Sequence, residues 1–212
     1  MNICLVNEAG LADADLAIIT KAVQYFVPLV TSAWKLPTYT VSTSTTAQAG
    51  AWNIYLTERN RHVGATGWHG VEGGLPVAYC SPRASYRLFG KYYKPFVIKG
   101  KQIYAARYSE GLVTTICHEI AEMLCDQKIT TYSAPDSQGR KWLVEVCDHV
   151  FGSFLIYTVA GTDCVLPDVT IPAFYDLKGI APYSLNNAVS APFTMTVKGY
   201  GYYAGANGLA KI

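Results

Sequence analysis

The sequence predicts one α+β domain spanning residues 1–212, and three observations support this fold class. Two segments carry apolar residues at helical spacing, and several β-rich runs are bounded by glycine and proline. Half of the residues are hydrophobic and 13% are aromatic, so a chain of this length can bury a sizeable core. We therefore expect an N-terminal helix, a mixed sheet, a second helix and an extended C-terminal part.

The first predicted helix covers residues 11–27. Apolar residues recur there at steps of three and four, namely Leu16, Ile19, Val23 and Phe26. Asp13 and Asp15 favour its N-terminal end, because carboxylates interact favourably with the helix dipole there. Pro28 is expected to stop or kink the helix.

The sheet is predicted from the segment that follows. Residues 38–57 are rich in Thr, Val and Tyr, and 52–56 form the clearest strand. Glycines at 64, 67, 70, 73 and 74 predict turns around Trp68 and His69.

The second predicted helix covers about residues 110–126. A polar turn at 133–139 and a strand over 142–147 should follow, and then a hairpin that turns near Gly161. The C-terminal part is expected to be extended and looped, because it carries Pro167, Pro172, Pro182 and Pro192.

The chain is poor in charge, and this excludes several classes of protein. Only 15% of its residues are charged, against about 25% in typical domains. The composition excludes a disordered tail, a coiled coil and a collagen-like fibre. The net charge of +2 gives no global reason to expect nucleic acid or an anionic membrane as a partner.

The ends and the cysteines suggest a soluble protein that is not secreted by the general route. No basic residue precedes Lys21, so the start does not resemble a signal peptide. No apolar run appears long enough to span a membrane. The six cysteines include no C-x-x-C pair, so we expect small buried residues in a reducing compartment, with disulfides as the alternative.

Residues 83–107 differ from the rest of the chain. They contain seven basic residues, no acid and several interleaved aromatic residues. Three interpretations remain open: a solvated flap whose Lys and Arg stems cover apolar surface, a surface that docks another protein, and a groove for single-stranded nucleic acid. The flap is favoured and nucleic acid is disfavoured.

The most informative motif is H-E-x-x-E, formed by His118, Glu119 and Glu122. A composition with so few histidines and glutamates gives about 0.004 chance matches. On a helix, His118 and Glu122 share one face, and Glu119 stands at the flank. Apolar residues fill the opposite face: Leu112, Val113, Ile116, Ile120, Met123 and Leu124.

This arrangement corresponds to H-E-x-x-H zinc hydrolases with Glu in place of the second His. His118 and Glu122 would hold the metal, and Glu119 would act as the general base toward metal-activated water. The alternative is a surface helix whose acids are solvated. Zinc is the first choice of metal, and calcium or manganese would also suit a site with several carboxylates.

A third ligand must come from elsewhere, and the next acidic cluster is residues 145–149. An extended segment would point Glu145 and Asp148 to opposite faces, whereas a helix would place them on one face. Glu145 is the first choice as the third ligand, and Asp148 would orient the ligands without binding the metal. Asp148, Asp126 and His149 are the alternative ligands.

These motifs resemble a family of predicted metallopeptidase-like proteins of tailed phages and bacteria, whose pattern is H-E-x-x-E-x-x-x-D followed by E-V-C-D. The match is carried by His118, Glu119, Glu122, Asp126 and the run 145–148. Weaker matches follow in the same order along the chain: 24–34, Gly67-Trp68-His69, 75–78, 168–174 and 191–200. Gln127 and His149 replace the prolines usual after the two aspartates, the stretch 83–107 is longer than usual, and the glycines near 199 are fewer.

The resemblance implies a zincin-like α+β fold in which the second helix carries the active site. It implies metal at His118 and Glu122, Glu119 as base, and a peptide or protein as substrate. The alternative function is a structural or docking protein of a phage particle that keeps this fold and contacts other virion proteins through 83–107. Host cytoplasm and phage particle are both compatible locations.

Overall fold

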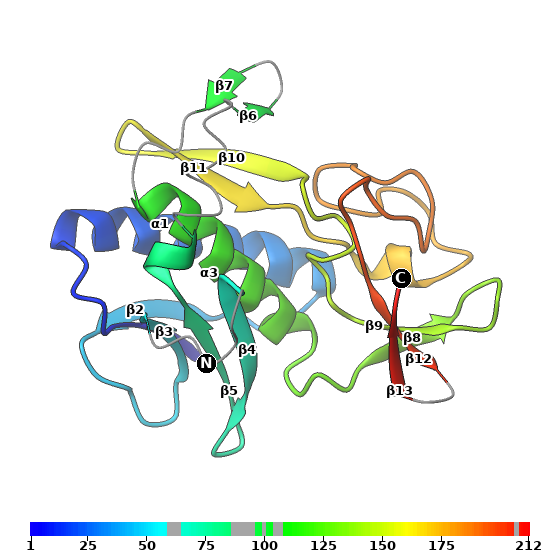
Figure 1. Ribbon diagram of the computed structural model, residues 1–212, viewed down its shortest axis with the longest axis horizontal. Helices are drawn as coiled ribbons and strands as arrows, with labels where there is room; N and C mark the ends of the chain where they lie inside the picture. The colour runs from blue at the N-terminus through cyan, green and yellow to red at the C-terminus, as the bar shows by residue number, and fades with distance from the viewer. Residues whose placement is uncertain (59–64, 86–95, 99–100, 104–107, 206–207) are drawn as a thin grey trace.

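A computed structural model describes residues 1–58, 65–85, 96–98, 101–103, 108–205 and 208–212 (Figure 1). Most of the basic and aromatic stretch 83–107 lies outside these residues. Its described strands, β6 (Phe96–Ile98) and β7 (Lys101–Ile103), form an antiparallel pair. The three interpretations of this stretch therefore remain predictions.

The main sheet has the strand order β2-β1-β3-β5-β4. Neighbouring strands run parallel, except that β4 pairs antiparallel with β5 at one edge. The expected strand 52–56 is confirmed as β3. The strands are β1 (Asn2–Asn7), β2 (Thr40–Ser44), β3 (Trp52–Leu56), β4 (Gly67–Glu72) and β5 (Leu75–Cys80).

The first helix, α1 (Asp13–Trp34), joins the parallel strands β1 and β2. It continues through Pro28, so proline does not stop the helix, and the alternative expectation of a kink at Pro28 stays a prediction. Val27, Val30 and Thr31 on either side of Pro28 are buried, and this packing offsets the missing backbone hydrogen bond. The helix ends at Trp34, and Lys35 after it adopts a left-handed conformation (φ 53°).

Contrary to the sequence-based expectation, α1 is long and apolar enough to cross a membrane by length and composition alone. Buried core helices meet the same criterion. In this fold the inner side of α1 is buried against α3 and the main sheet.

The second helix, α3 (Tyr108–Cys125), lies between two β layers (Figure 1). β4 and β5 pack against it on one side, and β11 packs against it on the other. β11 (Thr162–Pro167) pairs with β10 (Phe154–Val159), which confirms the hairpin predicted near Gly161. Because both sides are covered, the helix is central rather than superficial.

Two C-terminal strands pair with two strands that follow α3 and form a smaller sheet in the order β13-β12-β9-β8. Its strands are β8 (Tyr132–Pro135), β9 (Lys141–Leu143), β12 (Tyr202–Gly205) and β13 (Gly208–Lys211), and a 3-10 helix, η1, covers Pro172–Tyr175. The strand expected over 142–147 ends at Leu143, after which the chain enters turns.

The described structure is thus a mixed α+β fold, as predicted. All six cysteines are free, and five of them are buried, which agrees with their interpretation as small core residues.

Candidate metal centre

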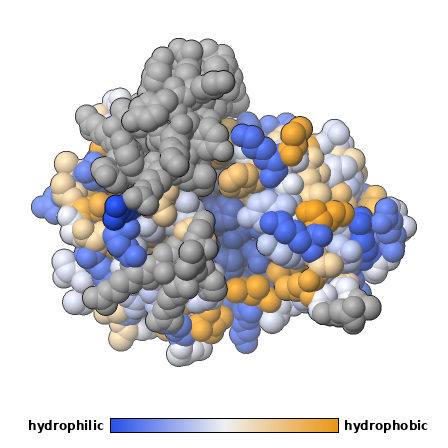
Figure 2. All heavy atoms as spheres, in the orientation of Figure 1, coloured by the Kyte–Doolittle hydropathy of each residue, from blue (hydrophilic) through white to orange (hydrophobic). Residues whose placement is uncertain are grey.

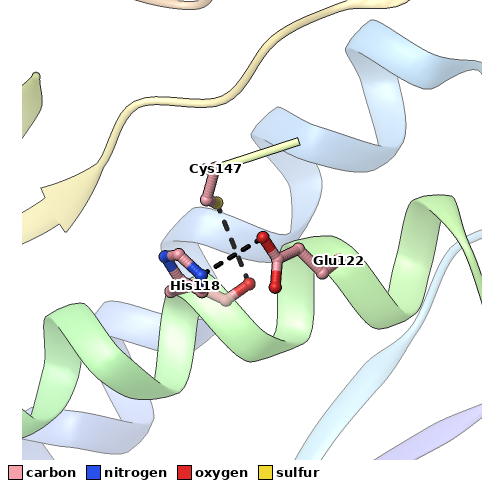
Figure 3. A group of neighbouring side chains, drawn as sticks. All are labelled: His118, Glu122 and Cys147. Atoms are coloured by element: carbon pink, nitrogen blue, oxygen red, sulfur yellow. Dashed lines mark hydrogen bonds and ion pairs between the residues drawn. The ribbon is translucent and has the colours of Figure 1, made fainter. Parts of the chain in front are cut away.

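Helix α3 brings the two outer residues of the H-E-x-x-E motif together. His118 Nε2 lies 3.2 Å from Glu122 Oε1, one helical turn away (Figure 3). The Glu119 and Glu122 side chains are buried, whereas the His118 side chain keeps 17% of its surface exposed. The interpretation of the motif as solvated acids on a surface helix is therefore wrong.

The position of these residues leaves a route to water. Figure 2 shows a hydrophilic recess near the centre of the viewed face, at the position that the C-terminal half of α3 occupies in Figure 1. The partial exposure of His118 agrees with such a recess. The motif is consequently buried but not sealed.

The segment after β9 brings two carboxylates close to the motif. It forms neither the strand nor the helix considered from the sequence. Residues 146–150 form turns, closed by the hydrogen bond from Phe151 N to Asp148 O (3.2 Å). Asp148 Oδ1 lies 3.3 Å from His118 Nε2, and Glu145 Oε2 lies 3.9 Å from His69 Nε2. Both side chains therefore join a cluster that also contains His69, His118, Glu119 and Glu122. Asp148 lies beside His118, and Glu145 lies beside His69.

His69 is the residue that sequence reasoning missed. It belongs to β4 rather than to a turn, and its Nδ1 lies 3.0 Å from Glu119 Oε2 and 3.5 Å from Glu122 Oε2. Gly67 lies on the same face of the strand, two residues earlier. A Cβ at Gly67 would lie 2.7 Å from Thr115 Cγ2 and would collide with the Glu119 carboxylate, so glycine permits this close approach to α3.

A usable signal for His69 was present in the sequence. The Gly67-Trp68-His69 segment belongs to the family resemblance, and glycine and histidine at alternate positions fit a strand that approaches another element closely. Tyr200 was also missed. Its side chain hydrogen-bonds Asp148, and its backbone N–H donates to Asp148 O (3.0 Å).

Four buried polar atoms of this cluster have no hydrogen-bond partner. They are His69 Nε2, Glu122 Oε1, Glu145 Oε2 and Asp148 Oδ1, and His149 Nε2 is the only other such atom in the part of the chain that the structure describes. Buried side-chain polar atoms normally have partners. The His118 ring nitrogen faces Glu122 Oε1 at 3.2 Å and Asp148 Oδ1 at 3.3 Å, and a bound cation would complete the bonding of these converging atoms.

The electrostatics of the cluster also favour positive charge. Burial would lower the pKa of His69, but the hydrogen bond to Glu119 and the charges of Glu122 and Glu145 outweigh it and raise that pKa to about 9. Burial raises the pKa of Glu145 to about 9, with a further contribution from the charge of Glu122. Among the described residues, the positive partners of these carboxylates are the imidazoles of His69 and His118, and a bound cation would take the place of their protons.

Cys147 lies beside the same cluster. Its Sγ donates to His118 O (3.8 Å), as Figure 3 shows. The donor atoms of His118, Glu122 and Cys147 lie within 4.8 Å of one another, as do those of His69, Glu122 and Glu145. Burial raises the pKa of the Cys147 thiol well above its usual range, which disfavours the thiolate that a metal would need.

Two of the alternative ligands lie outside the cluster. The Asp126 carboxylate accepts hydrogen bonds from Thr130 N (3.0 Å), Thr131 N (2.8 Å) and Thr131 Oγ1 (2.9 Å), so it closes the turn after α3. His149 is fully buried among aromatic rings, and its Nδ1 lies 3.2 Å from the Tyr175 hydroxyl.

The donor set narrows the choice of metal. Two imidazoles with several carboxylates suit zinc or manganese, whereas calcium prefers oxygen ligands alone.

The chain matches no protein-family model, no curated protein and no solved structure at a significant level. The function must therefore be inferred from the residues of the site.

Proposed function

We propose that the protein is a metal-dependent hydrolase that acts on peptide bonds or chemically similar bonds. One observation carries this proposal. Buried atoms that could bind a metal and that have no hydrogen-bond partner converge from α3, β4 and the 145–148 segment. The family resemblance, with its zincin-like fold and its phage and bacterial context, points to the same chemistry.

The proposed ligands of the metal are His118, Glu122 and Asp148. Zinc bonds of 2.0–2.1 Å in a tetrahedral site separate the ligand atoms by about 3.3 Å. His118 Nε2 lies 3.2 Å from Glu122 Oε1 and 3.3 Å from Asp148 Oδ1, so two of the three ligand pairs agree with that spacing. Asp148 therefore replaces Glu145 as our first choice for the third ligand, because Glu145 lies on the side of His69.

Glu119 is proposed as the general base. A bound divalent metal would supply Lewis-acid activation of water near neutral pH. Glu119 directly follows the first ligand and lies beside the site, and His69 Nδ1 at 3.0 Å holds its Oε2 in place. It can take a proton from the attacking water and deliver it to the leaving amine.

The position of β4 favours an extended substrate. In the described part of the chain β4 is the last strand of the main sheet, and it carries His69. An edge strand can pair with an extended peptide through backbone hydrogen bonds. A peptide bound along β4 would pass next to the proposed metal, so we favour a peptide or protein substrate.

The test is metal analysis of protein prepared without chelators, combined with a peptide-library assay. Glu119→Gln should keep the metal and lose activity, whereas His118→Ala should lose activity together with the ion that His118 holds. Glu72→Gln, which removes an exposed carboxylate from the same strand as His69, is the matched control for metal binding and should keep the metal. A wild-type protein that binds no metal and cleaves no peptide would contradict the proposal.

A second candidate is a structural or docking protein of a phage particle. It is favoured by large apolar side chains that are exposed in the C-terminal loops, at Leu177, Ile180 and Val197. Such side chains mark contact surfaces when they gather in a patch. The test is the copy number in purified particles, where absence of the protein would eliminate this candidate. A hydrolase carried by the particle would satisfy both proposals.

A further inference from the structure

The cluster contains more ligands than one metal ion needs. Beyond His118, Glu122 and Asp148, it holds His69, Glu119 and Glu145, all at least nine-tenths buried. Among the described residues, these four carboxylates have ion pairs only with His69 and His118. The surplus lies on the β4 side of Glu122.

The two oxygens of Glu122 face different histidines. Oε1 lies 3.2 Å from His118 Nε2, and Oε2 lies 3.5 Å from His69 Nδ1. A carboxylate whose two oxygens point to different sides can bridge two cations, and such pairs are typically about 3.5–4 Å apart. The 3.5 Å contact is with Nδ1 of His69, so the reach of Glu122 to the second ion rests on the ligand atoms of His69, Glu122 and Glu145, which lie within 4.8 Å of one another. Glu122 is therefore placed as a shared ligand.

The β4 side also contains metal-binding atoms that have no hydrogen-bond partner. His69 Nε2 and Glu145 Oε2 both lack hydrogen-bond partners and lie 3.9 Å apart. Donor atoms of His69, Glu122 and Glu145 lie within 4.8 Å of one another. This separation allows one ion to contact all three residues after a small adjustment.

Glu119 orients His69 for this role. The hydrogen bond between His69 Nδ1 and Glu119 Oε2 (3.0 Å) leaves Nε2 as the ring nitrogen that can accept a metal. A carboxylate behind the far nitrogen of a ligating histidine is a usual arrangement in metal sites.

Charge balance favours two bound divalent ions over one. Glu119, Glu122, Glu145 and Asp148 are all buried, and buried carboxylates are costly unless they are neutralised. One divalent ion would offset only half of the four negative charges. Two divalent ions with two neutral imidazoles would offset all of them.

We propose that the protein binds a pair of divalent metal ions bridged by Glu122, the first held by His118 and Asp148 and the second by His69 and Glu145. This inference rests on the proposed metal-dependent function and adds a second site to it. The second ion would lie against β4, on the side where an extended substrate would bind.

The experiment counts bound metal. Protein stripped with chelator is reloaded with Zn²⁺, desalted and analysed by atomic spectroscopy. Wild type and Glu72→Gln should each retain two equivalents. His69→Ala and Glu145→Gln should each retain one, and His118→Ala should also retain one.

The outcomes separate this inference from the proposed function. One equivalent in wild type, or two equivalents retained by His69→Ala and Glu145→Gln, overturns the second site and leaves the first. No bound metal in wild type overturns both. Glu145→Gln removes only a charge, so it tests the site if His69→Ala fails to fold.

A spectroscopic measurement checks the bridge directly. Wild-type protein loaded with Mn²⁺ should give the electron paramagnetic resonance spectrum of an exchange-coupled pair. Glu145→Gln should give the spectrum of an isolated ion. An isolated-ion spectrum in fully loaded wild type would contradict the bridging role of Glu122.

Discussion

His69 and His149 are both buried histidines with a partnerless Nε2, yet their surroundings are opposite. His69 faces Glu119, Glu122 and Glu145. His149 packs against the rings of Trp142 and Phe174. Because the two side chains are similarly buried, a difference between their pKa values reflects the residues around them.

The pKa values express this difference. Burial lowers the pKa of His149 to about 4, so it is neutral at pH 7. At His69 burial acts in the same direction, but the neighbouring carboxylates reverse it and raise the pKa to about 9. Burial alone thus does not locate a functional histidine, and the carboxylates around it do.

The largest expected effect is on catalysis in the carboxylate cluster. Glu119→Gln keeps the shape of the side chain but removes the base, so kcat/KM should fall by about 10²–10⁴-fold. Steady-state kinetics on a peptide substrate measure this effect, and metal analysis serves as the control. Unchanged kcat/KM would remove Glu119 from the reaction.

A change in the aromatic region should affect stability instead. His149→Ala leaves a cavity between Trp142 and Phe174 and removes the partner of the Tyr175 hydroxyl. We expect a loss of about 2–4 kcal/mol in the free energy of unfolding, measured by urea denaturation. Metal content should stay at the wild-type value, and its loss would show that the two regions are not separate.

Metal binding should stabilise the fold through the carboxylate cluster. A metal at 100 times its Kd adds about 2.7 kcal/mol when it binds only the folded state. Thermal unfolding with and without Zn²⁺ measures the shift in Tm. His118→Ala should lose most of this shift, whereas an equal shift in both proteins would place the stabilising ion elsewhere.

The smallest of these effects is expected at Asp126, the last acid of the extended motif. Its carboxylate accepts three hydrogen bonds from Thr130 and Thr131. Asp126→Asn should cost about 1–2 kcal/mol of stability, seen in the urea midpoint. Metal content and kcat/KM should not change, and a loss of metal would return Asp126 to the site.

Much of the fold was predictable because it depends on local periodicity. The spacing of apolar residues predicted both long helices, and a composition rich in Thr, Val and Tyr predicted strand β3. The turn at Gly161 predicted the β10–β11 hairpin. Pro28 does not stop the helix, because tertiary packing holds the helix through it. The burial of α3 was missed because the covering strand β11 comes from a distant part of the chain.

The site was predictable only where one helix supplies it. The helical repeat places His118 next to Glu122, so local geometry was sufficient for that pair. Glu145 and Asp148 lie in turns whose shape no periodicity encodes. His69 reaches Glu119 through the close packing of β4 on α3 at Gly67, a tertiary contact that the sequence only hints at.

The most direct test of the central claim is anomalous diffraction from crystals grown with Zn²⁺. We predict a metal peak at about 2.0–2.2 Å from His118 Nε2 and from carboxylate oxygens of Glu122 and Asp148. Zinc-loaded crystals with no peak within bonding distance of His118 and Glu122 would contradict the claim that this cluster is a metal centre.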